Sequence, residues 1–217
     1  MKKRHTDAGK RVADVVVSGA LLTVTAPLQI GVAIAVRIGL GTPVLFRQAR
    51  PGRNGELFTL IKFRTMQPVD PGRGLVDDDE RLTSLGQMLR RTSLDELPTL
   101  WNVLRGHMGL VGPRPLLPEY LTRYSPEQAR RHEVRPGVTG LAQISGRNQI
   151  SWERRLALDV EYVDRRSLGL DVRILWATVR TVFSGRGVAA DGHVTMPRFD
   201  AAEGDPAVSG HDQAETR

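Results

Sequence analysis

Two adjacent carboxylates, Asp95 and Glu96, are the side chains of this 217-residue sequence best suited to catalysis. They lie in the segment SLDELP (93–98), with two arginines just upstream and GPRP (112–115) downstream. On a helix the two side chains would point roughly 100° apart, so they cannot face each other across a substrate as a glycosidase pair does. An ionised aspartate among cations is suited to attack on a phosphoryl group, because the cations neutralise the charge that develops.

A structural interpretation of the same segment competes with the catalytic one. If Asp95 is the N-cap of a helix, Pro98 falls in the first turn, where no backbone amide hydrogen is needed. Asp95 would then cap the helix, with Glu96 as a supporting acid. A carboxylate at the positive end of a helix also stays ionised, so the two interpretations remain open at the level of the residues.

Further basic residues stand in rigid or turn settings where they could bind phosphate. In KFRTM (62–66), Lys62 and Arg64 lie on the same side if the chain is extended. Arg135 and Arg147 stand beside Pro or Gly, where backbone amides can also approach an anion. Each could be a solvated or structural cation, but several such residues in turns suggest a phosphate clamp.

Several other chemistries are excluded or unsupported. The chain has no cysteine, which excludes disulfides, thiolate metal sites and a cysteine nucleophile. The five histidines show no ligand spacing, so no zinc site is predicted, and neither a P-loop nor a GxGxxG fingerprint is present. The acidic run DDDE (77–80) is interpreted as a solvated loop and helix N-cap rather than a metal site. Aromatic residues are too few for a single-stranded nucleic-acid platform.

The element that would hold this chemistry at a membrane is an apolar segment near the N-terminus. Residues 12–36 contain one formal charge, Asp14, and a helix of that length would extend about 37 Å, enough to cross a hydrocarbon core of about 30 Å. Five basic residues precede the segment, and no small-residue cleavage site of a signal peptide follows it. We therefore expect the segment to be retained.

A proline and the flanking charges predict that this segment enters and leaves the membrane on one side. Pro27 removes a helix hydrogen bond near the middle of the segment. Basic residues flank both ends, and basic flanks prefer the cytoplasmic face. The expectation is a re-entrant hairpin of two helices, 12–26 and 28–36, broken at Pro27. The alternative is an ordinary single span with a proline kink.

The rest of the sequence predicts a small α+β domain that is mainly helical. Residues 57–63 read as a strand and residues 82–91, 98–104 and 151–166 as helices. Residues 168–188 form a basic amphipathic pattern that could lie at a membrane interface or pack on the domain core. The predicted divisions are a basic segment (1–11), the membrane hairpin (12–36), a catalytic domain (37–188) and a partly irregular C-terminal extension (189–217).

The charge distribution narrows the choice of anionic partner. The chain carries 31 Lys and Arg against 24 Asp and Glu, a net charge of +7. Residues 189–217 hold six acidic residues and two arginines, so they carry −4 and residues 1–188 carry +11. Basic residues beside an anionic leaflet contribute roughly 1 kcal/mol each, so the cluster before the apolar segment favours a membrane face over nucleic acid.

The motifs, taken together, resemble the bacterial sugar transferase family, the monotopic phosphoglycosyl transferases in their minimal catalytic form. The resemblance is collinear from about residue 10 to residue 199. It rests on long strings: KRVADVVVSG, PVLFRQARPGRNGELFTLIKFRTM, LGQMLRRTSLDELPTLWNVLRGHMGLVGPRP, VRPGVTGLAQISGRN, LDVEYVDRRSLGLDVRIL and GHVTMPRF.

The resemblance implies transfer of a sugar 1-phosphate from a UDP-sugar to a polyprenyl phosphate on the cytoplasmic face of the bacterial inner membrane, giving polyprenyl-diphospho-sugar and UMP. Asp95 would form a covalent phosphosugar intermediate and Glu96 would hold Mg²⁺. The candidates for phosphate and uridine contacts are Lys62, Arg64, Arg114, Arg135 and Arg147. Asp159 and Tyr162 match a later motif of the family and are further candidates for substrate binding, with their exact role left open.

Two other hypotheses stay open beside this one. A membrane-anchored basic binding module would use Asp95 and Glu96 only as a helix cap. A single-displacement transferase would use Asp95 only as a metal ligand. The sugar also stays open: GHVTMPRF resembles small family members and suggests an N-acetylated amino or diamino sugar, with galactose and glucose as alternatives.

Overall fold

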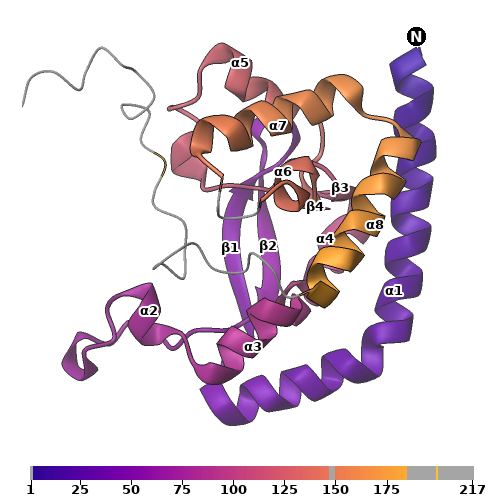
Figure 1. Cartoon of the computed structure of the whole chain (residues 1–217). Coiled ribbons are helices and arrows are strands. Elements are labelled where there is room, and N and C mark those ends of the chain that lie inside the picture. The colour runs from indigo at the N-terminus through magenta and orange to yellow at the C-terminus, as the bar shows by residue number, and fades with distance from the viewer. Residues whose placement is uncertain (1, 147–149, 185–198, 200–217) are drawn as a thin grey trace, which may run out of the picture.

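A computed structural model describes residues 2–146, 150–184 and Phe199 of the chain. The described part is mainly helical with two small sheets, as the sequence predicts (Figure 1). Its main elements are α1 (Lys2–Leu40), β1 (Leu45–Pro51), β2 (Leu57–Phe63), α2 (Asp78–Arg81), α3 (Ser84–Thr92), the 3₁₀ helix η3 (Leu94–Thr99), α4 (Leu100–Leu104), β3 (Gly109–Val111), α5 (Pro126–Ala129), β4 (Gly137–Thr139), α6 (Leu141–Ile144), α7 (Trp152–Arg165) and α8 (Leu168–Ser184).

The N-terminal segment is one bent helix rather than two helices folded into a hairpin. α1 continues without interruption through Pro27, and Figure 1 shows two arms that diverge at a sharp bend. We attribute the bend to Pro27, since sharp helix kinks arise mostly at proline. A proline removes one backbone hydrogen bond, and the turns on either side can continue, so the predicted break becomes a bend.

α1 carries an apolar surface that the domain leaves uncovered. By length and composition it could cross a membrane. Along the helix, Val12, Val16, Val24, Ile30 and Ile38 are each between 62% and 81% exposed. An exposed apolar surface of this extent is typical of a protein or membrane contact. This surface supports the membrane association predicted from the sequence.

Polar contacts fasten the first arm of α1 to the domain. Lys10 Nζ donates to Asp171 Oδ2 in α8 at 2.7 Å. The guanidinium of Arg11 donates to the carbonyl oxygens at the end of α4, including that of Val103 at 2.6 Å. Asp14 Oδ1 accepts a hydrogen bond from the Leu110 amide of β3 at 3.2 Å. The lone charge of the apolar segment therefore faces the domain rather than the uncovered side.

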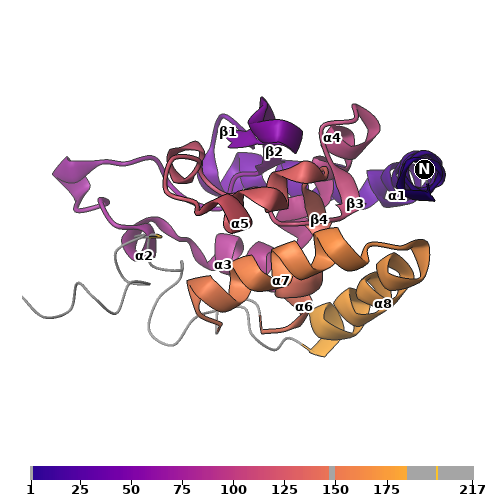
Figure 2. The ribbon, with the colours of Figure 1, turned by 90° about the horizontal axis from the view of Figure 1, so that it is seen from above.

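β1 and β2 form an antiparallel hairpin whose register runs from Leu45 opposite Phe63 to Pro51 opposite Leu57. The bounds of β2 match the predicted strand 57–63. Phe58 and Leu60 of β2 pack in the main core with residues of α4, β3, α7 and α8. Seen from above, the hairpin and α7 lie on opposite sides of β4 (Figure 2).

Short strands β3 and β4 pair in parallel and bring two loops into backbone contact. Gly109 lies opposite Gly137, and Val111 lies opposite Thr139. A Cβ atom on Gly137 would lie 2.1 Å from the amide nitrogen of Gly112, so no side chain fits there. This close approach sets the position of the segment that follows β3, which contains Arg114.

The C-terminal helices agree with the predicted ranges. α7 fills nearly all of 151–166, and α8 begins at Leu168 as expected. The structure supports the core-packing interpretation of α8 and does not test the interfacial one. Ile174 is fully buried in the core, whereas Val172 and Trp176 are 66% and 67% exposed on another side of the helix. The packing is therefore confirmed, and the interfacial position of the exposed side stays a prediction.

Three further predictions concern the other helices, the acidic run and the C-terminal extension. The predicted helix 82–91 overlaps α3, which runs from Ser84 to Thr92, whereas residues 98–104 are split between η3 and α4. Asp77 caps α2 in a capping box with Glu80, which confirms the structural interpretation of the acidic run. The predicted irregular extension, 189–217, lies outside the described residues except for Phe199, which packs with Tyr120 and Leu156.

Candidate active site

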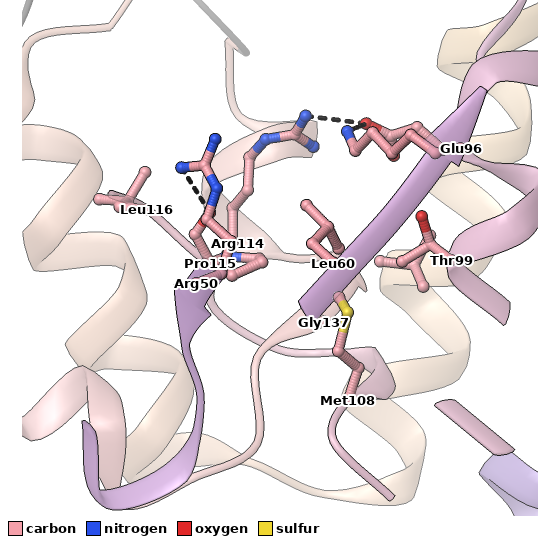
Figure 3. Close-up of a pocket in the computed structure, with 11 residues that line it drawn as sticks. Arg50, Leu60, Glu96, Thr99, Met108, Arg114, Pro115, Leu116 and Gly137 are labelled. Carbon is pink, nitrogen blue, oxygen red and sulfur yellow. Dashed lines mark hydrogen bonds and ion pairs between the residues drawn. The ribbon is translucent and has the colours of Figure 1, made fainter. Parts of the chain in front are cut away.

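Glu96 is held by two cations from different parts of the chain. Lys62 Nζ, on β2, donates to Glu96 Oε1 at 2.6 Å. Arg114, in the loop after β3, donates to the same oxygen at 2.8 Å (Figure 3). Burial opposes the charge on Glu96, but the charges of Arg114 and Lys62 outweigh it and hold the pKa of Glu96 below its ordinary value. Glu96 is therefore ionised throughout the physiological range.

Asp95 lies beside this cluster in a different electrostatic state. Its side chain is buried, and within the described part of the chain its carboxylate accepts no hydrogen bond. Burial and the neighbouring charge of Glu96 raise the pKa of Asp95 to about 6, against the opposing influence of Lys62, Arg114 and Arg90. A carboxylate that is poorly solvated and not hydrogen-bonded keeps its lone pairs available for attack.

The helix-cap interpretation of Asp95 is wrong. Asp95 lies inside η3, whose N-cap is Ser93, and Ser93 makes no capping hydrogen bond through its side chain. Ser93 has φ of 57°, in the left-handed region that few residues other than glycine adopt. This turn joins α3 to η3, and Arg90 in the last turn of α3 lies near enough to Asp95 for their charges to attract.

A pocket opens next to the Glu96 cluster. Its charged lining residues are Arg50, Lys62, Glu96 and Arg114 (Figure 3). Leu60, Met108 and Val138 contribute apolar lining. The three cations outnumber the one carboxylate, so the pocket has an excess of positive charge and favours an anion.

Backbone and side-chain contacts fix Lys62 opposite Glu96. Asn102 is buried in α4, and its side chain bonds to the backbone of β2. Its Oδ1 accepts from the Ile61 backbone N–H at 3.1 Å, and its Nδ2 donates to the Thr59 carbonyl at 2.7 Å. Thr99 Oγ1, at the end of η3, donates to the Ile61 carbonyl at 3.1 Å. These bonds join β2 to η3 and α4, the segment that carries both carboxylates.

Arg64 and Arg135, predicted for phosphate binding, do not line this pocket. The guanidinium of Arg64, the residue after β2, donates to the carbonyl oxygens of Leu40, the last residue of α1, and of Thr42. Arg135 Nε donates to the Gly106 carbonyl at 2.8 Å. Both satisfy backbone carbonyls at the ends of other elements. Arg147 lies outside the described residues.

Asp159 and Tyr162, also predicted for substrate binding, are buried within the domain. Asp159 Oδ2 accepts from Arg131 at 2.7 and 3.1 Å. The hydroxyl of Tyr162 hydrogen-bonds Asp171 at 2.7 Å and lies 3.1 Å from the Val111 carbonyl. In this arrangement both residues support the elements around the pocket from within the core.

Two arginines of the site region were missed in the sequence. Arg131 is 2% exposed, and its Nη2 donates to the Arg114 carbonyl at 2.7 Å. Arg50 lines the pocket from β1. The hairpin register could have revealed Arg50, because it places Arg50 on the same face as Lys62. No local signal distinguishes Arg131 from the surface arginines around it.

The carboxylates suit Mg²⁺ only if a substrate completes the coordination. The described residues contain no group of three or more His, Cys, Asp or Glu that could hold a metal ion. Mg²⁺ commonly binds one or two carboxylates together with substrate phosphates and water. Among the described contacts, both bonds to Glu96 use Oε1, which leaves Oε2 open, and Asp95 lies beside it. The pair therefore fits Mg²⁺ delivered with a phosphorylated substrate.

Comparisons with known proteins match this chain to sugar transferases. The model of a family described as bacterial sugar transferase matches residues 5–185. An uncharacterized sugar transferase of Bacillus subtilis (strain 168), EpsL, is 50% identical over 191 residues, covering 88% of this chain and 95% of its own. A Caulobacter vibrioides protein named UDP-glucose:undecaprenyl-phosphate glucose-1-phosphate transferase is 40% identical, covering 82% of this chain and 71% of its own.

The chain also matches part of a longer relative. The undecaprenyl-phosphate glucose phosphotransferase of Komagataeibacter xylinus is 42% identical over 191 residues. The match covers 81% of this chain but 36% of that protein.

Proposed function

The chain belongs to the bacterial sugar transferase family, and we propose that it transfers a sugar 1-phosphate from a UDP-sugar to a polyprenyl phosphate, giving polyprenyl-diphospho-sugar and UMP. The enzyme class follows from the family, whose named relatives include phosphotransferases acting on undecaprenyl phosphate. The observation that carries the proposal is the Asp95–Glu96 pair: one carboxylate is bound to Lys62 and Arg114, and the other is free of hydrogen bonds from the described residues.

The proposed reaction has two displacements at one phosphorus atom. In the first, a carboxylate oxygen of Asp95 attacks the β-phosphorus of the UDP-sugar, and the bond from that phosphorus to the bridging oxygen breaks, so UMP leaves with the electron pair. In the second, a phosphate oxygen of the polyprenyl phosphate attacks the same phosphorus and releases Asp95. One phosphoanhydride replaces another, so positioning and charge neutralisation matter more than driving force.

The cations of the site have defined tasks in this scheme. Lys62 and Arg114 neutralise Glu96 in the absence of substrate and can redirect their N–H groups to phosphate oxygens as charge moves onto UMP. We propose that Glu96, with Asp95 beside it, would hold Mg²⁺ together with the diphosphate. A bound Mg²⁺ would supply Lewis-acid stabilisation of the phosphate oxygens.

We further propose that the domain lies on the cytoplasmic face of the inner membrane, with α1 entering and leaving one leaflet. The exposed apolar side chains of α1 and its bend support this arrangement. Reporters of sidedness fused to each end of the chain should both report the cytoplasm. Reporters on opposite sides would replace the re-entrant arrangement with a single span.

The function is tested by the first displacement alone. The purified protein is incubated with Mg²⁺ and, in turn, UDP-glucose, UDP-galactose and UDP-sugars with N-acetylated amino groups, without lipid. For the correct donor we expect up to one equivalent of UMP and a mass increase equal to one phosphosugar.

The outcomes of this assay separate the alternatives. UMP that appears only after polyprenyl phosphate is added, with no adduct, would indicate a single displacement. No UMP from any donor, with or without lipid, would favour a binding module. The donor that reacts also identifies the sugar.

The raised pKa of Asp95 predicts the pH dependence of the first displacement. Only the ionised carboxylate attacks, and its pKa is about 6, so kcat/KM for UMP release should be level above pH 7 and fall about tenfold per unit well below pH 6. Glu96→Gln removes the like charge and should shift the midpoint to lower pH while reducing the maximal rate. A profile that stays level down to pH 4.5 would contradict the assignment of Asp95 as nucleophile.

A further inference from the structure

The pocket has a second basic end, formed by Arg50. In the β1–β2 register, Arg50 lies opposite Phe58 and Lys62 lies opposite Phe46. Residues paired directly across two strands share a face, as do residues two apart, so Arg50 and Lys62 face the same side of the hairpin. Four residues along a strand separate the two positions by about 13 Å. Figure 3 shows Arg50 and Glu96 on opposite sides of the pocket, with Arg114 between them.

Arg50 forms no direct ion pair with a described carboxylate, and Glu119 attracts its charge only from a longer distance. Its guanidinium donates to Gln48 Oε1 at 2.6 Å, and a contact of 3.5 Å to the Pro115 carbonyl is the other hydrogen bond in the described structure. Its Nε is buried and has no hydrogen-bond partner among the described residues. A buried donor without a partner and a cation without a direct ion pair are both stabilised by a bound anion.

Arg114 adds to the positive charge around Arg50. Burial and the nearby charge of Arg114 lower the pKa of Arg50 to about 10, so the two guanidinium groups repel each other across the pocket. Glu96 forms ion pairs at the Lys62 end, whereas at the Arg50 end no described carboxylate forms one and Glu119 acts only from a longer distance. An anion that contacts both arginines would relieve the repulsion.

The position of Arg50 in the fold indicates the source of that anion. The other end of the hairpin, at Leu45 and Phe63, packs against Val32 and Val36 in the second arm of α1. Arg50 lies toward the opposite end, next to the turn between β1 and β2. A lipid phosphate held by the membrane would approach from the α1 side, so the Arg50 end suits the water-soluble substrate.

We propose that Arg50, together with Arg114, binds the α-phosphate of the donor nucleotide and retains it as UMP forms. This inference rests on the proposed function and extends it to a residue outside the carboxylate cluster. The β-phosphorus would lie beside Asp95 and the α-phosphate farther along the pocket, with Arg114 within reach of both. Arg50 would thus serve donor binding and the first displacement, and would have no part in the second.

The test compares Arg50→Gln with Arg47→Gln. Arg47 lies on the same strand, is exposed and faces the other side of the hairpin, so its replacement removes the same charge from outside the pocket. UMP affinity is measured by calorimetry, and the donor KM by UMP release. We expect Arg50→Gln to weaken UMP binding and raise the donor KM by about tenfold or more, while Arg47→Gln changes neither by more than about twofold.

Two further measurements separate phosphate binding from a structural role and from lipid binding. Transfer of the phosphosugar from an isolated adduct to polyprenyl phosphate should proceed at the wild-type rate in Arg50→Gln. Arg50→Lys, which keeps the charge, should recover part of the UMP affinity, and it replaces the glutamine variant if that variant does not fold.

Each contrary result has a defined meaning. UMP affinity equal in the Arg50 and Arg47 variants would overturn the proposal, and so would a wild-type protein that does not bind UMP. A defect confined to the second displacement would also overturn it, because it would assign Arg50 to the lipid phosphate. A wild-type protein that binds UMP through Arg50 but never releases it from a UDP-sugar would contradict the proposed function and leave the nucleotide site standing.

Discussion

Asp95→Asn is expected to abolish the phosphosugar adduct and to lower turnover by at least about a thousandfold, because the covalent route needs a carboxylate oxygen at this position. Asparagine has nearly the same shape, so Lys62 and Arg114 should keep their bonds to Glu96. The measurement is adduct mass and UMP release with the donor found for the wild type. Asp78→Asn, in the acidic run, is the matched control, since its surface pair with Arg81 contributes little.

The same substitution should stabilise the protein above pH 6. The pKa of Asp95 is about 6 in the folded protein, against an ordinary value of 3.8 in an unfolded chain. Ionised Asp95 therefore destabilises the fold once the pH exceeds the unfolded pKa, and the full effect is present above the folded pKa. Asparagine removes this penalty. The melting temperature of Asp95→Asn should therefore exceed that of the wild type at pH 7.5, and the difference should vanish near pH 3.5.

These two readouts distinguish a nucleophile from a structural acid. If Asp95 were a structural acid, its replacement would lower both the stability of the protein and its activity. A variant that keeps wild-type turnover would remove Asp95 from the mechanism altogether. An active variant without adduct would leave the single-displacement scheme, in which Asp95 only helps to bind metal.

Asp159→Asn is expected to destabilise the fold by roughly 3–5 kcal/mol, because it leaves the buried guanidinium of Arg131 without its counter-charge. Both side chains are 2% exposed or less. Arg131 also donates to the Arg114 carbonyl, so its displacement should move Arg114 away from Glu96 and lower kcat. Denaturant unfolding gives the stability, and UMP release gives the kinetics.

A double substitution separates the effect on stability from the effect on kcat. Replacing Asp159 by leucine and Arg131 by methionine gives the buried site an apolar pair of similar size, and such pairs often restore stability. The hydrogen bond to the Arg114 carbonyl would still be missing, so kcat should stay low in a protein that is stable again. If Asp159 instead contacts substrate, as the family resemblance implies, Asp159→Asn would raise KM without loss of stability.

The predicted elements that matched the structure depend on short-range patterns. The strand 57–63, the helix 151–166 and the cap of the acidic run are encoded by residues within a few positions of one another. The same local chemistry singled out Asp95, Glu96 and Lys62 for one site. Adjacent carboxylates and motif strings are properties of the sequence itself, which is why the family could be identified from them.

Local patterns failed where a distant element decided the outcome. Extended spacing assigned Lys62 and Arg64 to one phosphate-binding side, but the carbonyls of Leu40 and Thr42, at and just after the end of α1, bind the Arg64 guanidinium. Pro27 predicted a break between two helices, but α1 continues through it as one bent helix. Asp95 resembled a cap, but the left-handed turn at Ser93 places it inside a buried 3₁₀ helix.

By itself, the sequence determined the family, the candidate carboxylate pair and the apolar N-terminal segment, because composition and neighbouring residues encode them. The tertiary structure alone decided which cations reach the pair: Lys62 from β2 and Arg114 from the loop after β3. It also decided that Arg131 and Asp159, 28 positions apart, hold Arg114 from within the core, and that Arg50 faces the pocket. Contacts of this kind depend on strand register and on the packing of distant segments, which no single stretch of sequence specifies.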